Sequence, residues 1–311
     1  MVSPLEVVEI VRHLSFFAQH TDSIQITLQF AYTAGNIIFA KVLWNIMKAM
    51  TFTLAIPLLS GWFSGWLVNY LADVLPATRR LSRPECHQCG HAYRLVDYLL
   101  FRSCPSCGHP RGPRPWIVQA AMLAVSLYTW IRPHAMGYAL GMLLLTYFGV
   151  VVVIDLEHRL ILHPTSIIGA LLALGIGLRL QGVRTTLLGG LAGLVIMLVL
   201  YLLGVLFSRY RARRMQAAGQ EADAEEALGA GDVILATILG LVIGWPIIWF
   251  ALLLGILLGG VVGIALLAAM LIRGMYGKQA LMVFMPYGPY FIVSAFIILF
   301  LPNWITGVLG R

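Results

Sequence analysis

Long apolar segments alternate with short polar segments along most of this chain, and that alternation predicts its architecture. The segments that are apolar for most of their length span residues 51–74, 115–131, 136–155, 164–179, 185–208, 231–245, 247–272 and 284–302. A helix needs roughly 20 mostly apolar residues to cross the hydrocarbon core of a bilayer. The pattern therefore predicts an all-α polytopic membrane protein with about eight transmembrane helices.

The same pattern divides the chain into four parts. Residues 51–76 form a first transmembrane helix, residues 77–114 a polar loop domain, and residues 115–311 the remaining transmembrane core. Residues 1–50 mix apolar and charged side chains, which is typical of amphipathic helices at a membrane interface. An additional span over residues 26–47 is the alternative, although Lys41 would then lie inside the bilayer.

Composition excludes an ordinary water-soluble domain. Of the 311 residues, 60% are hydrophobic and 11% are charged, and the mean hydropathy is +0.87. The net charge of +8 arises from basic residues in short loops between apolar segments, so it indicates membrane orientation and no nucleic-acid partner. The first nine residues contain no basic segment, so we expect no cleaved secretory signal there.

The distribution of basic residues predicts the orientation. The loops on the outer side contain only Arg132, Arg179 and Arg184 if the 77–114 loop is cytoplasmic. The inner loops then collect the remaining loop cations: Arg79, Arg80, Arg83, Arg94, Arg102, Arg111, Arg114, Arg159, Arg209, Arg211, Arg213, Arg214, Arg273 and Lys278. This bias predicts a multi-pass protein with both termini outside and the 77–114 loop in the cytoplasm.

Four cysteines in that loop indicate a metal site. Cys86 and Cys89 form one C-x2-C pair, and Cys104 and Cys107 form a second pair after 14 intervening residues. This spacing is typical of structural zinc, and four thiolates leave no open position for a catalytic water. Two disulfides or free thiols are the alternative, and His87 or His91 is a possible substitute ligand.

Two aspartates at the ends of apolar segments are candidates for chemistry. Asp155 ends one segment, and Asp232 begins another directly after Gly229-Ala230-Gly231. A carboxylate inside a membrane costs a few kcal/mol, so it normally pairs, lines a watered cavity or reacts. Two such acids at one face can divide acid and base roles and activate a water for peptide hydrolysis. Gly229 and Gly231 leave room for an extended peptide to approach, so we predict that they bind substrate.

Each aspartate also has a purely structural interpretation. Asp155 stands four residues before Arg159, the spacing of an ion pair on one helix face. Asp232 stands near a helix N-terminus, where the helix dipole favours a negative charge. Regularly spaced small residues predict helix packing elsewhere, at Gly61 and Gly65 and at Gly255, Gly259 and Gly263. Asn69, one turn after Gly65, fits either an interhelical hydrogen bond or a polar ligand.

Several motifs together resemble the bifunctional type IV prepilin peptidases, intramembrane aspartyl proteases named for a Gly-x-Gly-Asp motif. The motifs that carry the resemblance are Gly61 to Asn69 with Leu75-Pro76, the four cysteines, Ile154 to His158, Gly229 to Asp232 with Gly240 and Gly244 to Pro246, and Pro286 to Tyr290. The chain departs from the family at Ile234, where a lysine is usual, and at Leu162, where a proline is usual and Pro164 comes two residues later.

The resemblance implies an enzyme of the prokaryotic plasma membrane. Such an enzyme cuts a basic leader from prepilins or pseudopilins after a glycine at the cytoplasmic face. It then methylates the new N-terminus with S-adenosylmethionine as the methyl donor. Asp155 and Asp232 match the catalytic positions, and Cys86, Cys89, Cys104 and Cys107 match the family's cysteine loop.

Two other functions fit parts of the sequence. One is a peptidase without methyl transfer. The other is a transporter or channel whose buried acids relay protons or cations and whose metal loop is regulatory. The acids stand near one membrane face and the chain shows no evident inverted repeat, both of which disfavour a transporter.

Overall fold

The computed structural model describes residues 37–132, 134–217, 229–273 and 286–301. The chain divides into two compact units, residues 1–56 and 57–311, and the packing described below is that of the second unit. Residues 1–36, and with them most of the predicted interfacial segment, lie outside the described residues. Helix α2 spans Ile37–Thr78, so it begins well before the predicted start at residue 51. The sequence between these two positions contains no proline or glycine that would end a helix.

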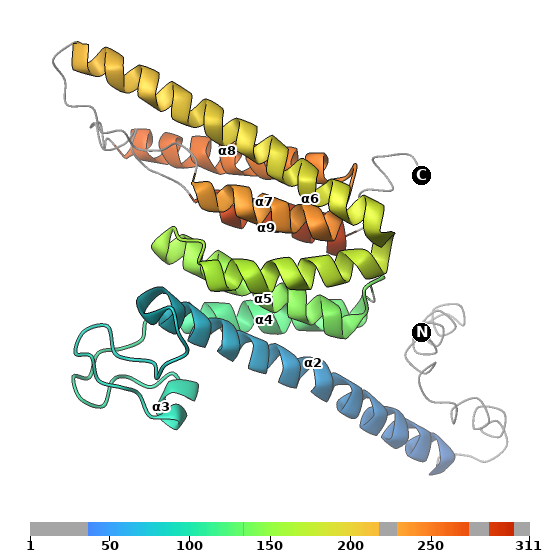
Figure 1. Cartoon of the computed structure of the whole chain (residues 1–311). Helices are drawn as coiled ribbons and strands as arrows, with labels where there is room; N and C mark the ends of the chain where they lie inside the picture. The colour runs from blue at the N-terminus through green and yellow to red at the C-terminus, as the bar shows by residue number, and fades with distance from the viewer. Residues whose placement is uncertain (1–36, 133, 218–228, 274–285, 302–311) are drawn as a thin grey trace. The chain divides into compact units, whose positions relative to one another are not determined.

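The second unit is built from helices, and each predicted span corresponds to a helical segment (Figure 1). A short helix, α3, spans Leu95–Leu99 within the cysteine loop. The remaining helices are α4 (Arg114–Ile131), α5 (Tyr138–His158), α6 (His163–Ala217), α7 (Ala230–Ile243), α8 (Ile248–Ile272) and α9 (Gly288–Phe300). This confirms the prediction of an all-α polytopic membrane protein.

Helix α6 contains two of the predicted spans. A straight helix of 55 residues would be about 80 Å long, well over twice the thickness of the hydrocarbon core. Gly182 interrupts it with a φ of 80° and a ψ of 171°, a conformation that side chains disfavour. The interruption falls between the predicted spans 164–179 and 185–208, as the sequence pattern indicates.

Length and composition identify the strongest membrane-spanning candidates among the described helices. Four stretches are long and apolar enough to cross a membrane: Thr53–Thr78, Tyr138–His158, His163–Arg214 and Ile248–Met270. Helices α7 and α9 are apolar but shorter. The described helices therefore fit a membrane protein that combines long spans with shorter apolar helices.

Small residues allow the close approach of α2 and α4. A side chain at Gly61 would collide with Ser126, and one at Gly65 would collide with Gln119. Asn69 is fully buried and donates hydrogen bonds to the backbone oxygens of Gly65, at 3.0 Å, and of Pro115, at 3.2 Å. The structure thus supports the packing interpretation of this segment, and Asn69 bonds to a neighbouring helix.

The glycines of α8 divide in their roles. Gly255 and Gly259 pack closely against Phe291 and Tyr287, next to or within α9. Gly263, by contrast, faces open space among the described residues. The predicted packing stripe therefore has close contacts at Gly255 and Gly259, and the described residues include no close neighbour of Gly263.

The closest helix pair is α6 with α7, and α9 contacts α5, α7 and α8. The backbones of α6 and α7 are in direct contact where the helices cross, because a side chain at Gly189 would overlap the backbone oxygen of Gly240. Leu144, Leu235 and Phe291 are fully buried in the core that these helices form. Helix α9 thus packs against both helices that carry the candidate aspartates.

Candidate functional site

The first cysteine pair lies in a tight loop whose shape its backbone hydrogen bonds explain. The N–H of Gly90 donates to the Cys86 oxygen at 2.8 Å, and the N–H of Cys86 donates to the His91 oxygen at 2.9 Å. Gly90 has a φ of +69°, a conformation in which glycine carries no steric penalty. The sequence Cys-x-x-Cys-Gly-His therefore folds into a turn that directs both thiols inward.

The second pair repeats this turn. The N–H of Gly108 donates to the Cys104 oxygen at 2.8 Å, and that of Cys104 donates to the His109 oxygen at 3.0 Å. Gly108 also has a φ of +69°. The Gly-His extension of each cysteine pair is visible in the sequence but is not part of the predicted motif.

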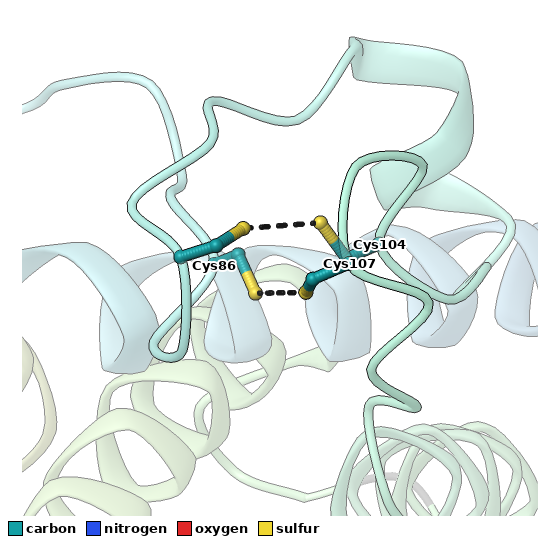
Figure 2. Close-up of side chains that lie close together, drawn as sticks. Cys86, Cys104 and Cys107 are labelled. Carbon is teal, nitrogen blue, oxygen red and sulfur yellow. Dashed lines mark hydrogen bonds between the residues drawn. The ribbon is translucent and has the colours of Figure 1, made fainter.

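The two turns face each other and bring their sulfur atoms together (Figure 2). The Sγ atoms of Cys86 and Cys107 are 3.7 Å apart, those of Cys89 and Cys104 are 3.6 Å apart, and all four lie within 4.8 Å of one another. A tetrahedral zinc ion with Zn–S bonds of about 2.3 Å requires sulfur separations of about 3.8 Å. The four thiols therefore fit a structural metal such as zinc.

Backbone hydrogen bonds favour the form of Cys86 that binds metal. The N–H groups of Gln88 and Cys89 point at its sulfur and lower the pKa of Cys86 to about 6. This shift favours the thiolate, which is the ligand form. Cys86 and Cys104 are buried, whereas Cys89 and Cys107 are exposed.

An ionic cluster at Asp73 joins this cysteine module, residues 79–113, to the end of α2. Arg111 pairs with Asp73 Oδ2 at 2.7 Å and Arg114 pairs with Oδ1 at 2.6 Å. Tyr98 donates a further hydrogen bond to Oδ2 at 2.5 Å. Burial, followed by the charge of Asp73, raises the pKa of Tyr98, so its hydroxyl stays protonated and remains a donor. The guanidinium of Arg111 also stacks over the Tyr98 ring at 3.9 Å.

Arg114 extends this cluster toward the candidate aspartates. Its Nε lies 3.1 Å from Oε1 of Glu157, in the last turn of α5 and two residues after Asp155. The cysteine module, the start of α4 and the end of α5 therefore lie at the same end of the helices. The predicted ion pair between Asp155 and Arg159 is not among the ion pairs of the described residues, and Glu157 forms the pair at this helix end.

Asp155 is buried in the last turn of α5, with 5% of its surface exposed. Its Oδ2 atom has no hydrogen-bond partner among the described residues. Gly288, at the start of α9, is so close that a side chain there would overlap this oxygen. The sequence motifs contain both residues, but no local spacing indicates that they touch across 133 positions of chain.

Asp232 lies in the first turn of α7, and 9% of its surface is exposed. Its Oδ2 atom accepts a hydrogen bond from the N–H of Gly229 at 3.3 Å. Position 288 touches both Asp155 and Leu235, which lies one helical turn after Asp232 on α7, so the two predicted acids lie near each other. The folded chain therefore holds two buried carboxylates, one from a helix end and one from a helix start.

The glycines before Asp232 have distinct surroundings. A side chain at Gly231 would lie 2.9 Å from Cβ of Ile161, so this glycine allows close packing on the loop after α5. Among the described residues nothing would crowd a side chain at Gly229, which interacts with Asp232 through its backbone. Ile234, at the position of the usual lysine, is 38% exposed and so points away from the buried interior.

These features define a class: a helical polytopic membrane protein with two buried carboxylates and a four-cysteine module that could hold a metal ion. Residues 142–264, which contain both aspartates, match the model of the type IV leader peptidase family. This match confirms the resemblance predicted from the motifs.

One curated relative covers a larger part of the chain. The prepilin leader peptidase/N-methyltransferase of Myxococcus xanthus (strain DK1622) is 27% identical over 218 residues. The alignment covers 66% of this chain and 60% of that relative. No solved structure matches the chain.

Proposed function

We propose that this protein is a membrane-embedded aspartyl endopeptidase that removes the basic leader of a prepilin or pseudopilin after a glycine. We further propose that it methylates the new N-terminus. The observation that carries the peptidase proposal is the proximity of Asp155 and Asp232, both buried within the part of the chain that matches the type IV leader peptidase family. The activity named for the Myxococcus relative supports the same substrate class and the methyl transfer.

The chemistry follows from having two carboxyl groups with unequal protonation. Repulsion between two nearby carboxylates favours a state in which one is ionised and the other holds a proton. The ionised group takes a proton from water, and the resulting hydroxide forms a bond to the carbonyl carbon of the scissile peptide. The protonated group donates its proton to the carbonyl oxygen. The C–N bond then breaks as the leaving nitrogen gains a proton, which yields a carboxylic acid and a free amine.

The second reaction uses that free amine. Its nitrogen forms a bond to the methyl carbon of the donor and loses a proton, and the donor leaves as a neutral thioether. S-adenosylmethionine supplies the methyl group when it is bound. Hydrolysis must come first, since only the cut substrate has the required amine.

Zinc in the cysteine module has a structural role in this proposal. Cys86, Cys89, Cys104 and Cys107 would occupy all its coordination positions and leave none for a water. The ion would hold the two turns together and thereby keep Tyr98 and Arg111 at Asp73.

The proposed location is the cytoplasmic face of a prokaryotic plasma membrane. The basic residues that the sequence places on one side include Arg111 and Arg114 of the Asp73 cluster. The Arg114–Glu157 pair, two residues after Asp155, supports the same side for the candidate aspartates.

The experiment that tests the peptidase proposal compares Asp155→Ala and Asp232→Ala with the unchanged protein. Each variant is expressed in membranes with a prepilin, and the mature pilin is measured. We expect both variants to lose cleavage. Unimpaired cleavage by either one would contradict the aspartyl mechanism.

A separate assay distinguishes the bifunctional enzyme from a peptidase without methyl transfer. The purified protein is incubated with labelled S-adenosylmethionine and a pilin that has already been cut. Label on the pilin N-terminus is the expected result. An unlabelled pilin, with cleavage intact, would leave only the peptidase.

A further inference from the structure

The first turn of α9 has one backbone N–H directed outside the helix. The N–H groups of Tyr290 and Phe291 donate to the Tyr287 oxygen, at 3.0 Å and 3.2 Å. Pro289 has no N–H to donate. Of the groups at this helix start, the N–H of Gly288 is the one with no backbone acceptor among the described residues, so it is available to a partner on another helix.

Asp155 is positioned to be that partner. Its Oδ2 is buried and has no hydrogen bond within the described part of the chain. A buried carboxylate oxygen without a donor is costly, by roughly 1–3 kcal/mol or more. The N–H of Gly288 already interacts favourably with the Asp155 carboxyl group.

The approach requires glycine at position 288. A Cβ there would overlap Asp155 Oδ2 and lie 3.1 Å from Asp155 Cγ. The other near neighbour, Leu235 Cδ2, would be 3.5 Å away, which is ordinary van der Waals contact. The steric demand on position 288 therefore comes from Asp155 and not from general crowding.

We propose that Gly288 is a positioning residue for Asp155: it brings the N-terminus of α9 against the carboxyl group and fixes which way that group faces. The proposal rests on the proposed peptidase function for its catalytic meaning. Because α9 also packs on α7, the same helix end sets the position of Asp155 relative to Asp232. Alanine at position 288 displaces the carboxyl group, α9, or both.

The kinetic test compares Gly288→Ala with two matched controls. Gly260→Ala and Gly263→Ala introduce the same methyl group on α8, where no atom of the described residues lies within 4 Å. A displacement of about 1 Å at a reacting group can cost about 100-fold in rate. We expect Gly288→Ala to lower kcat for prepilin cleavage about 100-fold with little change in KM, and both controls to stay within about twofold of the unchanged protein. A kcat within twofold of normal for Gly288→Ala would overturn the proposal.

A stability cycle tests the contact without any activity. Melting midpoints are measured for Gly288→Ala, Asp155→Ala and the double variant. When Asp155 is present, we expect Gly288→Ala to lower the melting midpoint by a few degrees. When Asp155 has been replaced by alanine, the same change should have almost no effect on the midpoint. An equal shift in both backgrounds, or a double variant that fails to fold, would overturn the proposal.

The two tests separate failure of this proposal from failure of the proposed function. If the unchanged protein cuts no prepilin, the peptidase assignment falls, whereas the melting cycle still decides the contact. If cleavage depends on both aspartates but the cycle shows no coupling, the function stands and the positioning role falls.

Discussion

Asp73, whose side chain is 9% exposed, and the buried Asp155 are both shielded carboxylates near the ends of long helices, yet they have opposite surroundings. Asp73 accepts bonds from Arg111, Arg114 and Tyr98. Asp155 has an oxygen with no partner among the described residues. Burial alone therefore does not separate a structural acid from a reactive one. The number of hydrogen-bond and ion-pair partners separates them, because a fully paired carboxylate is poorly suited to take up a proton or activate a water.

The same contrast extends to the two regions that contain these acids. The cysteine module is closed: its thiols face one another, and its charged groups pair with the helix ends beneath it. The carboxylate site is held by backbone contacts from Gly229 and Gly288, which leave the acids few fixed partners. We therefore expect changes in the module to act on structure and changes at the aspartates to act on chemistry.

The largest effect on the module should come from Cys86→Ser with Cys89→Ser. Removal of two of four thiolates should abolish zinc binding, because serine is a poor zinc ligand. We expect bound zinc to fall to near zero, and methyl transfer to decline more than cleavage. Elemental analysis and the two activity assays measure this.

His91→Ala is the matched control for that prediction. The His91 side chain is exposed, and its backbone oxygen still accepts the bond from Cys86 in the variant. Zinc should therefore be retained. Full zinc content in the double cysteine variant would refute the four-cysteine site, and cleavage lost as strongly as methyl transfer would refute the division of roles.

A smaller effect is expected from Asp73→Asn. The change leaves Arg111, whose side chain is 9% exposed, without its charge partner. Removal of one member of a buried pair costs about 3 kcal/mol. Unfolding in denaturant or proteolysis of residues 79–113 should reveal the loss.

Asp97→Asn provides the comparison for Asp73. Its partner, Arg102, lies 3.4 Å away and has a side chain that is 63% exposed. Loss of this surface pair should therefore lower the free energy of unfolding by less than about 1 kcal/mol. If the two substitutions destabilised the protein equally, the Asp73 cluster would not be what anchors the module.

The smallest effect is expected from Glu157→Gln, which weakens the link between the two regions. The side chains of Arg114 and Glu157 are 27% and 35% exposed, so their pair contributes at most about 1 kcal/mol. Cleavage should slow by no more than about fivefold. A loss of 100-fold or more in kcat would mean that Glu157 takes part in the chemistry. The distinction between a structural cysteine module and a reactive carboxylate site would then be wrong.

Periodicity and spacing in the sequence predicted much of this fold. The spans, the break near Gly182 and the clustering of four thiols follow from local patterns, since apolar length and C-x2-C spacing act over short stretches of chain. The close seam between α6 and α7 was missed, although Gly189 and Gly193 have the spacing of small residues that pack helices. The apolar pattern does not predict that α2 begins at Ile37, because Lys41 and Lys48 interrupt the apolar run before residue 51.

The candidate site was only partly predictable. The sequence indicated both aspartates as acids at the ends of apolar segments. It did not indicate that Arg114 joins Asp73 to Glu157, or that Gly288 lies against Asp155. Such contacts join positions that are distant in the chain and depend on how the helices pack. The local periodicity of a single sequence does not reveal this packing.

The most direct test of the central claim is the cleavage rate of Asp155→Asn, Asp232→Asn and the variant that carries both changes. Asparagine keeps the size of the side chain but cannot exchange the proton, and residues that act as a unit are not additive. The account predicts that each single change lowers the rate at least about 1000-fold and that the double variant is no slower than the slower single one. A single variant that keeps a rate within tenfold of normal, in protein that retains its melting midpoint, would contradict it.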